Sequence, residues 1–220
     1  LIDNFFITTC PSIIKSKIKK DKINFLPIPV DPNIESGNFF EIPKEKDLFF
    51  AISHGVNYGM LKDNVTDERS LFINKLIKIS NERINYNLFG LFGEQPKWNY
   101  EFNREIMISK TALNLSRGGP SKYCSSNRIA TIMGNGILPF IHEKVKYQDF
   151  FQDNEIITYK NETDLLQKLL SLKDNKKELI KRSRLAKKNY FKYFENTIIS
   201  DSIINIIFGT KEKYKYIWIK

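Results

Sequence analysis

The segment 110–141 constrains the fold of this chain more than any other part of the sequence. An apolar run at 112–115 ends in a small, basic loop that contains Gly118 and Gly119. Apolar residues then recur at helical spacing, and glycines separate this helical segment from a second apolar run at 137–141. Strand, loop, helix and strand in this order predict a βαβ unit with two parallel strands.

The loop of this unit collects backbone amides, hydroxyls and two arginines where the helix begins. A helix N-terminus has unsatisfied N–H groups and the positive end of the helix dipole, and both favour a bound phosphate. We therefore predict an anion site formed by Ser116, Arg117, Gly118, Ser125, Ser126, Asn127 and Arg128. The sequence alone leaves plainer roles open: a turn for the glycines, a helix cap for the serines and solvation for the arginines.

Length and composition limit the class of protein. The chain has 220 residues, enough for one domain with extra elements or for two small domains. No apolar run reaches the ~20 residues that span a bilayer. Cys10 and Cys124 form neither a disulfide framework nor a zinc spacing, so we expect a reducing cytoplasm. Leu1 is not a methionine, so we expect a fragment or a processed chain, and a missing N-terminal domain fits that expectation.

The formal net charge of +10 indicates an anionic partner: nucleic acid, an anionic membrane or a phosphorylated ligand. Much of the charge comes from the lysine-rich stretch 173–192, for which a solvated helix face is the simplest interpretation. The many aromatic residues do not form the compact signature of an RNA-stacking sheet.

Expected strands alternate with expected helices along most of the chain. Apolar runs predict strands at 47–53, 86–92, 112–116, 137–141 and 156–159. Helical spacing predicts helices at 66–84, 100–109, 126–134, 165–172, 175–190 and 195–207. This pattern is typical of an α/β fold, a Rossmann-like doubly wound parallel sheet. A ligand would lie beyond the carboxyl ends of the strands, near the loops 54–59, 94–97, 116–127 and 142–146.

Three segments together resemble a known family. The run ALNLSRG…YCSSNRIATIMGNGILPF is similar to the nucleotide-sugar-binding half of GT-B glycosyltransferases. The nearest likeness is to the group 1 transferases and their spore-maturation-protein-like relatives. The opening FFITTCPSIIKSKIKKDKINFLPIPVDP and the later FFQDNEIITYKNETDLLQKLLSLKDN also resemble that family. Each motif is short and degenerate, so the strength lies in their order and spacing.

The resemblance implies the C-terminal half of a GT-B two-domain architecture. In that interpretation, residues 1–30 end an N-terminal domain whose remainder is missing, and 31–46 link it to the next domain. Residues 47–194 form the nucleotide-sugar-binding Rossmann-like domain. The helix and tail at 195–220 cross back towards the N-terminal domain.

The resemblance also assigns roles to single residues. Arg128, Arg69 and His54 would be catalytic, the arginines by reaching the diphosphate leaving group. Donor contacts would come from Gly55, Ser116, Arg117, Gly118, Tyr123, Ser125, Ser126, Asn127 and Thr131. For Tyr123, core packing is the alternative, and Trp98 either stacks a nucleobase or packs. No metal or other cofactor is expected, because amides, basic side chains and the helix dipole stabilise the developing charge.

Thr131 departs from the family pattern. Many relatives have a glutamate three residues after the arginine, where it binds the ribose hydroxyls of the nucleotide. A threonine offers one weaker hydrogen bond, so the ribose contact is altered or the alignment differs. The donor is therefore not fixed by the sequence.

The first hypothesis is a glycosyltransferase that moves a sugar from a nucleotide sugar donor to a glycan, a lipid-linked acceptor or a protein. It would act in the cytoplasm, with peripheral contact to the inner membrane face as a further expectation. A non-catalytic nucleotide-sugar-binding module is the second hypothesis, motivated by Thr131. A nucleic-acid-binding α/β protein is the third, motivated by charge alone, and nucleic acid is not the expected partner.

Overall fold

The computed structural model describes residues 3–15, 17–53, 67–124 and 126–219. Its centre is a five-stranded sheet in which every pairing is parallel, in the order β4-β3-β5-β6-β7. The strands are β3 (Lys46–Ala51), β4 (Tyr86–Phe89), β5 (Ser109–Asn114), β6 (Leu138–His142) and β7 (Ile157–Tyr159). The predicted parallel α/β fold is confirmed.

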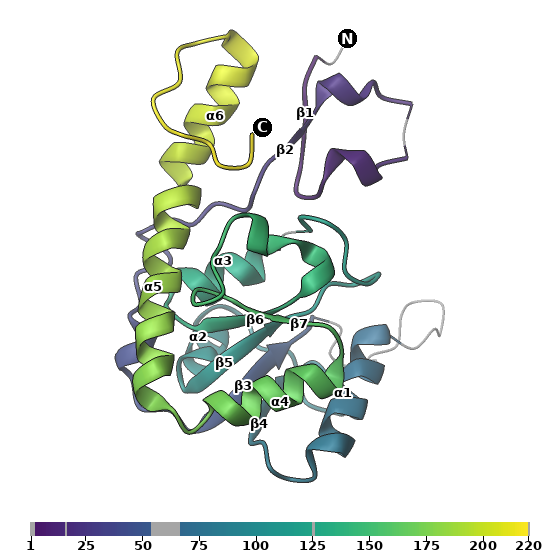
Figure 1. Ribbon diagram of the computed structural model, residues 1–220, viewed down its shortest axis with the longest axis vertical. Helices are drawn as coiled ribbons and strands as arrows, with labels where there is room; N and C mark the ends of the chain where they lie inside the picture. The colour runs from purple at the N-terminus through teal and green to yellow at the C-terminus, as the bar shows by residue number, and fades with distance from the viewer. Residues whose placement is uncertain (1–2, 16, 54–66, 125, 220) are drawn as a thin grey trace.

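Helices cover both faces of this sheet, as connections of one hand require. They are α1 (Glu68–Ser80), α2 (Asn99–Met107), α3 (Asn127–Gly134), α4 (Glu162–Leu172), α5 (Lys176–Phe194) and α6 (Asn196–Phe208). Helix α1 packs beside α4, and α3 packs beside α5. Figure 1 shows α1 and α4 on the near side of the sheet and α2 on the far side. Within the described residues, no helix is long and apolar enough to cross a membrane.

Side-chain caps fix where several helices begin. Asn161 accepts a hydrogen bond from the amide of Asp164 at 3.0 Å, and Asn175 accepts one from Glu178 at 3.1 Å. Asp67 does the same for α1 through the amide of Arg69. Helix α1 is therefore shorter than the expected helix 66–84.

The inward face of α1 is not formed by apolar residues alone. Leu71 is 57% exposed, whereas Ile73 and Leu76 are buried. The buried stripe also includes Arg69 and Ser80, because a helix advances about 100° per residue and these four positions share one side. The spacing of apolar residues alone does not predict a buried helix face that contains an arginine.

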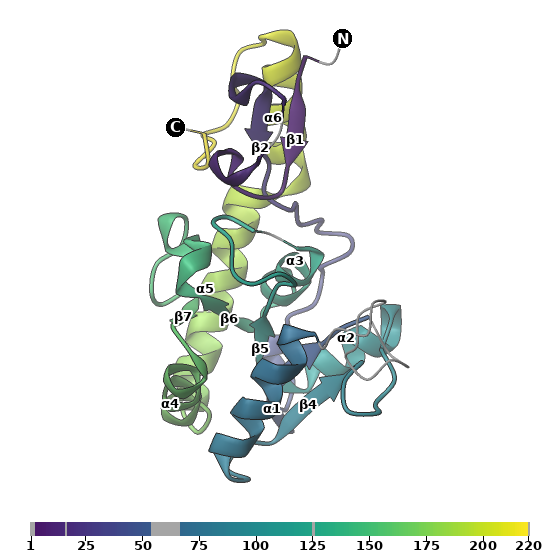
Figure 2. The same cartoon turned by 90° about the vertical axis from the view of Figure 1, so that its right-hand side faces the viewer.

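A smaller unit lies at one end of the molecule. Strands β1 (Phe5–Ile7) and β2 (Ile23–Phe25) form a two-stranded parallel sheet. In Figures 1 and 2 it lies beside α6 and the C-terminal tail. A single 3₁₀ turn, Pro11–Ile13, follows β1. The assignment of this unit to a preceding domain stays a prediction.

Residue Val30 joins the smaller unit to the main domain. Its amide donates to the carbonyl of Phe194 at 2.9 Å, and its carbonyl accepts from the amide of Asn196 at 2.9 Å. The tail returns to the same place, where Trp218 is buried and its ring lies 5.6 Å from that of Phe194. The expected linker 31–46 packs against the domain, with Phe40 buried.

Gly90 allows β3 and the turn after β4 to approach closely. Its φ is +74°, and a Cβ there would lie 1.9 Å from the carbonyl oxygen of Ile52. Gly209, which ends α6, has a similar φ of +63° but open space around it. Alanine at Gly209 would have backbone strain alone, whereas alanine at Gly90 would have backbone strain and a steric overlap.

We predict that Gly90→Ala lowers the free energy of unfolding by about 2–5 kcal/mol, the sum of left-handed strain and overpacking. The control Gly209→Ala has only the strain and should lose about 1–2 kcal/mol. Urea unfolding followed by circular dichroism measures both. Equal losses in the two variants would contradict the close approach at Ile52.

Candidate active site

The strand order reverses between β3 and β5, and Arg128 lies where these strands end. One terminal nitrogen of its guanidinium donates to the carbonyl of Ala51 at 2.9 Å, and the other donates to Leu115 at 3.1 Å. Ala51 is the last residue of β3, and Leu115 follows β5. Open parallel sheets bind ligands beyond their carboxyl ends at this reversal. Arg128 therefore forms the floor of the expected ligand crevice.

No carboxylate among the described residues forms an ion pair with Arg128, whose terminal nitrogens donate to two backbone carbonyls. Its guanidinium lies 5.1 Å from the centre of the Phe50 ring. Burial, together with the neighbouring guanidinium of Arg69, lowers the pKa of Arg128 to about 10. The side chain thus stays charged at neutral pH, but its charge is poorly solvated. An anion bound here would reduce that cost.

Arg69 also reaches this region, but an acid already balances its charge. Its Nε and one terminal nitrogen lie 2.9 Å and 2.5 Å from the two carboxylate oxygens of Asp67. Both side chains are buried. The pair places a rigid, largely neutral unit at the start of α1, close to Arg128. Asp67 was not identified from the sequence, because only the fold shows that this carboxylate faces inwards.

No side chain in the described part of the chain caps the start of α3. Ser126 occupies the cap position, yet its hydroxyl donates instead to the side-chain oxygen of Asn114 at 3.3 Å. Asn114 ends β5, is 2% exposed, and its buried Nδ2 finds no acceptor in the described part of the chain. Buried amide nitrogens normally have partners. This unsatisfied donor beside an uncapped helix N-terminus is suited to an acceptor oxygen of a ligand.

A pocket of about 240 Å³ opens next to Arg128. Its walls come from the end of β3, the start of α2 and the first turns of α3: Ala51, Ile52, Ser53, Lys97, Trp98, Asn99, Phe102, Asn127, Arg128 and Thr131. Trp98 is 59% exposed, so it is not the packed tryptophan that the sequence left as an alternative. Thr131 lies one helical turn after Arg128, and its hydroxyl donates to the carbonyl of Asn127 at 3.2 Å.

The glycine loop lies at the entrance to the same region. Gly118 and Arg117 are exposed, and Gly118 has a φ of +76°. The amide of Gly118 donates to the carboxylate of Glu68, the first residue of α1. The hydroxyl of Ser116 accepts from the thiol of Cys124 at 3.7 Å. The Gly118 amide, which we predicted to bind a phosphate, therefore donates its hydrogen bond to the Glu68 carboxylate in this structure.

Tyr123 lies apart from the pocket. Its side chain is buried, and its ring centre lies 5.2 Å from that of Phe25 and 4.8 Å from that of Phe150. Its hydroxyl donates to Asp149 at 2.6 Å. In this structure Tyr123 contributes packing between β2 and the main domain.

The remaining predictions lie beyond what the structure describes. His54, Gly55 and Ser125 are outside the described residues. In the described ranges, no group of three or more His, Cys, Asp or Glu side chains could hold a metal ion. The expectation of a metal-independent site stays a prediction.

Comparison with solved structures shows the same fold. Sucrose-phosphate synthase from Thermosynechococcus elongatus is 8% identical, with a TM-score of 0.57 over 94% of this chain and 58% of its own. HepE from Anabaena, solved with UDP, is 7% identical, with a TM-score of 0.56 over 87% and 59%. A TarM variant from S. aureus, solved with fondaparinux, α-GlcNAc-glycerol and UDP, is 15% identical, with a TM-score of 0.53 over 88% and 40%.

This chain thus spans between 40% and 59% of the length of those proteins. No protein of curated function matches it by sequence. The family model described as glycosyl transferase-like matches residues 69–196, from Arg69 in the first turn of α1 to Asn196, the first residue of α6. Because that match covers more than half of the chain, the protein belongs to the glycosyl transferase-like family.

Proposed function

We propose that this chain is the donor-binding half of a glycosyltransferase and binds a nucleoside diphosphate sugar where β3 and β5 diverge. The observation that carries the proposal is Arg128, a poorly solvated cation that joins the two strand ends beside a pocket. Sugar transfer from such a donor releases a nucleoside diphosphate. Fixed positive charge stabilises the negative charge that develops on the leaving oxygen.

The proposed diphosphate site combines three groups. Arg128 supplies charge, the uncapped N-terminus of α3 supplies amides and the positive end of its dipole, and Asn114 supplies an unsatisfied N–H. The pair of Arg69 and Asp67 acts as a positioning unit that holds the start of α1 in place. Binding at the glycine loop would displace Glu68 from the amide of Gly118.

The pocket beside Arg128 suits the nucleoside. Trp98 presents an exposed ring on which a base can stack, and Thr131 presents a hydroxyl near the expected ribose position. UDP, found in the structures of HepE and the TarM variant, is the first nucleotide to test. The acceptor, whether a glycan, a lipid-linked sugar or a protein, would approach from the other half of the enzyme. We propose that no metal takes part.

A non-catalytic nucleotide-sugar-binding module is the second candidate, favoured by Thr131 in place of glutamate. The two candidates differ in turnover. The full-length transferase should release nucleoside diphosphate from its donor when acceptor is present, whereas a binding module should bind the donor and leave it intact.

We predict that one diphosphate among UDP, GDP, dTDP, CDP and ADP binds this chain, measured by isothermal titration calorimetry. Arg128→Met should weaken that binding at least tenfold, which corresponds to about 1.4 kcal/mol. The control is Arg104→Met, which removes an arginine paired with Glu105 on the surface of α2 and should bind normally. Unchanged affinity in a folded Arg128→Met variant would contradict the proposal, as would no binding by the full-length protein.

Tryptophan fluorescence tests the base site separately. The chain has two tryptophans, and only Trp98 is exposed. We predict that the bound nucleotide quenches fluorescence and that Trp98→Phe abolishes the quenching. Trp98→Ala should weaken binding by about 1–3 kcal/mol, the value of one base–aromatic stack. Tyr100→Ala, which removes a 77% exposed ring outside the pocket, is the control. Quenching that survives in Trp98→Phe would contradict base stacking at Trp98.

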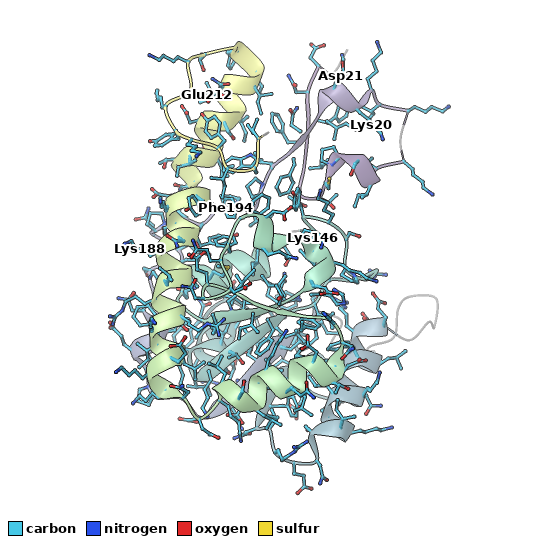
Figure 3. The ribbon with its side chains drawn as sticks, viewed as in Figure 1. Lys20, Asp21, Lys146, Lys188, Phe194 and Glu212 are labelled. Carbon is cyan, nitrogen blue, oxygen red and sulfur yellow. The ribbon has the colours of Figure 1, made fainter. Side chains whose placement is uncertain are left out.

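Helix α5 supports a second part of the proposal, contact with an anionic membrane. It contains eight lysines and arginines and one glutamate, a net +7 of the chain's +10. Five of these cations are exposed at intervals of three or four residues, so they follow one side of the helix: Lys177, Lys181, Arg184, Lys188 and Lys192. Figure 1 shows α5 along the outside of the molecule, and Figure 3 shows Lys188 on its outer side.

Each lysine near an anionic bilayer contributes about 1 kcal/mol of attraction. We predict that the chain cosediments with phosphatidylglycerol vesicles at low salt and not with phosphatidylcholine vesicles. Changing Lys177, Lys181, Lys188 and Lys192 to glutamine should abolish binding. Changing the exposed lysines 20, 78, 146 and 213 to glutamine removes equal charge elsewhere and should have a smaller effect. Equal loss in both variants would contradict a docking surface on α5.

A further inference from the structure

We propose a second ligand site at the amino-terminal edge of the sheet, in a pocket that takes an organic anion with an apolar body, such as an aryl or acyl phosphate. This inference is independent of the proposed transferase activity. The pocket has a volume of about 400 Å³ and lies between the first turns of α5 and the segment before β3. Lys44 precedes β3 and Lys110 is the second residue of β5, so the pocket lies at the opposite strand ends from Arg128.

Lys44 is the central cation of this pocket. Its ammonium donates to the carbonyl of Met107 at 2.6 Å, and the described part of the chain provides no carboxylate partner for it. Burial lowers the pKa of Lys44 to about 8. A buried charge that lacks a counter-charge is unfavourable, and a bound anion removes that penalty.

Three further lysines line the same pocket. Lys110 lies 2.8 Å from a carboxylate oxygen of Asp47, and Lys173 donates to the carbonyl of Arg83 at 2.9 Å. Lys176, the first residue of α5, is exposed. An ammonium group has three N–H donors, so the lysines that have one such contact retain donors for a ligand. Asp174 is the acid among the lining residues, and Asp47 balances Lys110, so the four lysines exceed these two acids by a charge of +2.

The rest of the lining is apolar. Phe40 and Leu179 are buried, and Ile42, Pro43 and Ile180 complete an apolar wall. Inorganic phosphate would satisfy the lysines but leave this wall in contact with water. A neutral apolar molecule would cover the wall but leave Lys44 without a counter-charge. Only a ligand that joins both parts matches the pocket, whose volume falls within the roughly 300–1,000 Å³ of small-molecule sites.

Calorimetry on the whole chain tests this site with three probes: 2-naphthyl phosphate, inorganic phosphate and 2-naphthol. We predict that 2-naphthyl phosphate binds at least tenfold more tightly than either of the others. Lys44→Met, which keeps most of the apolar stem, should weaken its binding at least tenfold. Lys78→Met removes an exposed lysine of α1 outside the pocket and should bind like the unchanged protein.

Several outcomes would overturn the site. Inorganic phosphate that binds as tightly as 2-naphthyl phosphate would indicate a simple anion site, and 2-naphthol that does so would indicate an apolar site. Equal affinity in Lys44→Met would remove Lys44 from the site. Competition with the nucleotide that binds beside Arg128, or loss of 2-naphthyl phosphate binding in Arg128→Met, would assign the probe to the donor site.

Mass spectrometry on the unchanged protein covers the case in which Lys44→Met does not fold. Limited acetylation followed by peptide mapping reports the reactivity of each lysine. 2-Naphthyl phosphate should protect Lys44 from acetylation by at least fivefold and leave Lys78 unprotected. Equal reactivity of Lys44 with and without the probe would overturn the proposal.

Discussion

The two hydrogen bonds from Arg128 to the ends of β3 and β5 are the interaction on which the candidate site depends. At a reversal of strand order the connecting segments leave in opposite directions, so the sheet opens into a crevice. A planar guanidinium can bridge that crevice, because its donors point in fixed, divergent directions. The charge that makes the bridge also makes the crevice attractive to an anion. The same side chain therefore joins the two strand ends and supplies the charge of the proposed site.

The order and type of the elements could be predicted from the sequence because the signals are local. The strand that contains Leu48, Phe49 and Phe50 is apolar without alternation, as expected for a strand covered on both faces. Asn161 and Asn175 mark helix starts through bonds to amides three residues away. The inward face of α1 could not be predicted in the same way. Its buried stripe contains Arg69, whose burial depends on Asp67 and on the neighbouring strands, and no pattern of apolar residues records such a pair.

The site could be predicted only in part, for a related reason. The predicted anion site at the loop and the start of α3 rests on residues adjacent in sequence. The hydrogen-bond partners of these residues lie far away in the sequence. Glu68 accepts from the Gly118 amide 50 positions later, and Ala51 accepts from Arg128 77 positions later. For Trp98 the sequence allows either base stacking or packing in the core, because large apolar side chains are usually covered. In the structure this residue is 59% exposed. For Tyr123 the packing alternative is the one observed, but its partners Phe25 and Phe150 lie far from it in sequence, so the sequence alone does not identify them.

The distribution of positive charge bears on what the whole surface can bind. A net charge of +10 in one continuous groove would favour nucleic acid, because affinity for nucleic acid grows with each neutralised phosphate. In this protein the cations discussed above lie in three separate regions: the carboxyl edge of the sheet, its amino edge and the outer face of α5. At the carboxyl edge, Arg69 is balanced by Asp67 and Arg128 is left to act on one ligand. At the amino edge, Lys44 and its neighbours line a single pocket, and the outer cations of α5 follow one face of the helix. Two separate sites and one line of charge suit small anions and a flat anionic surface better than a nucleic acid strand.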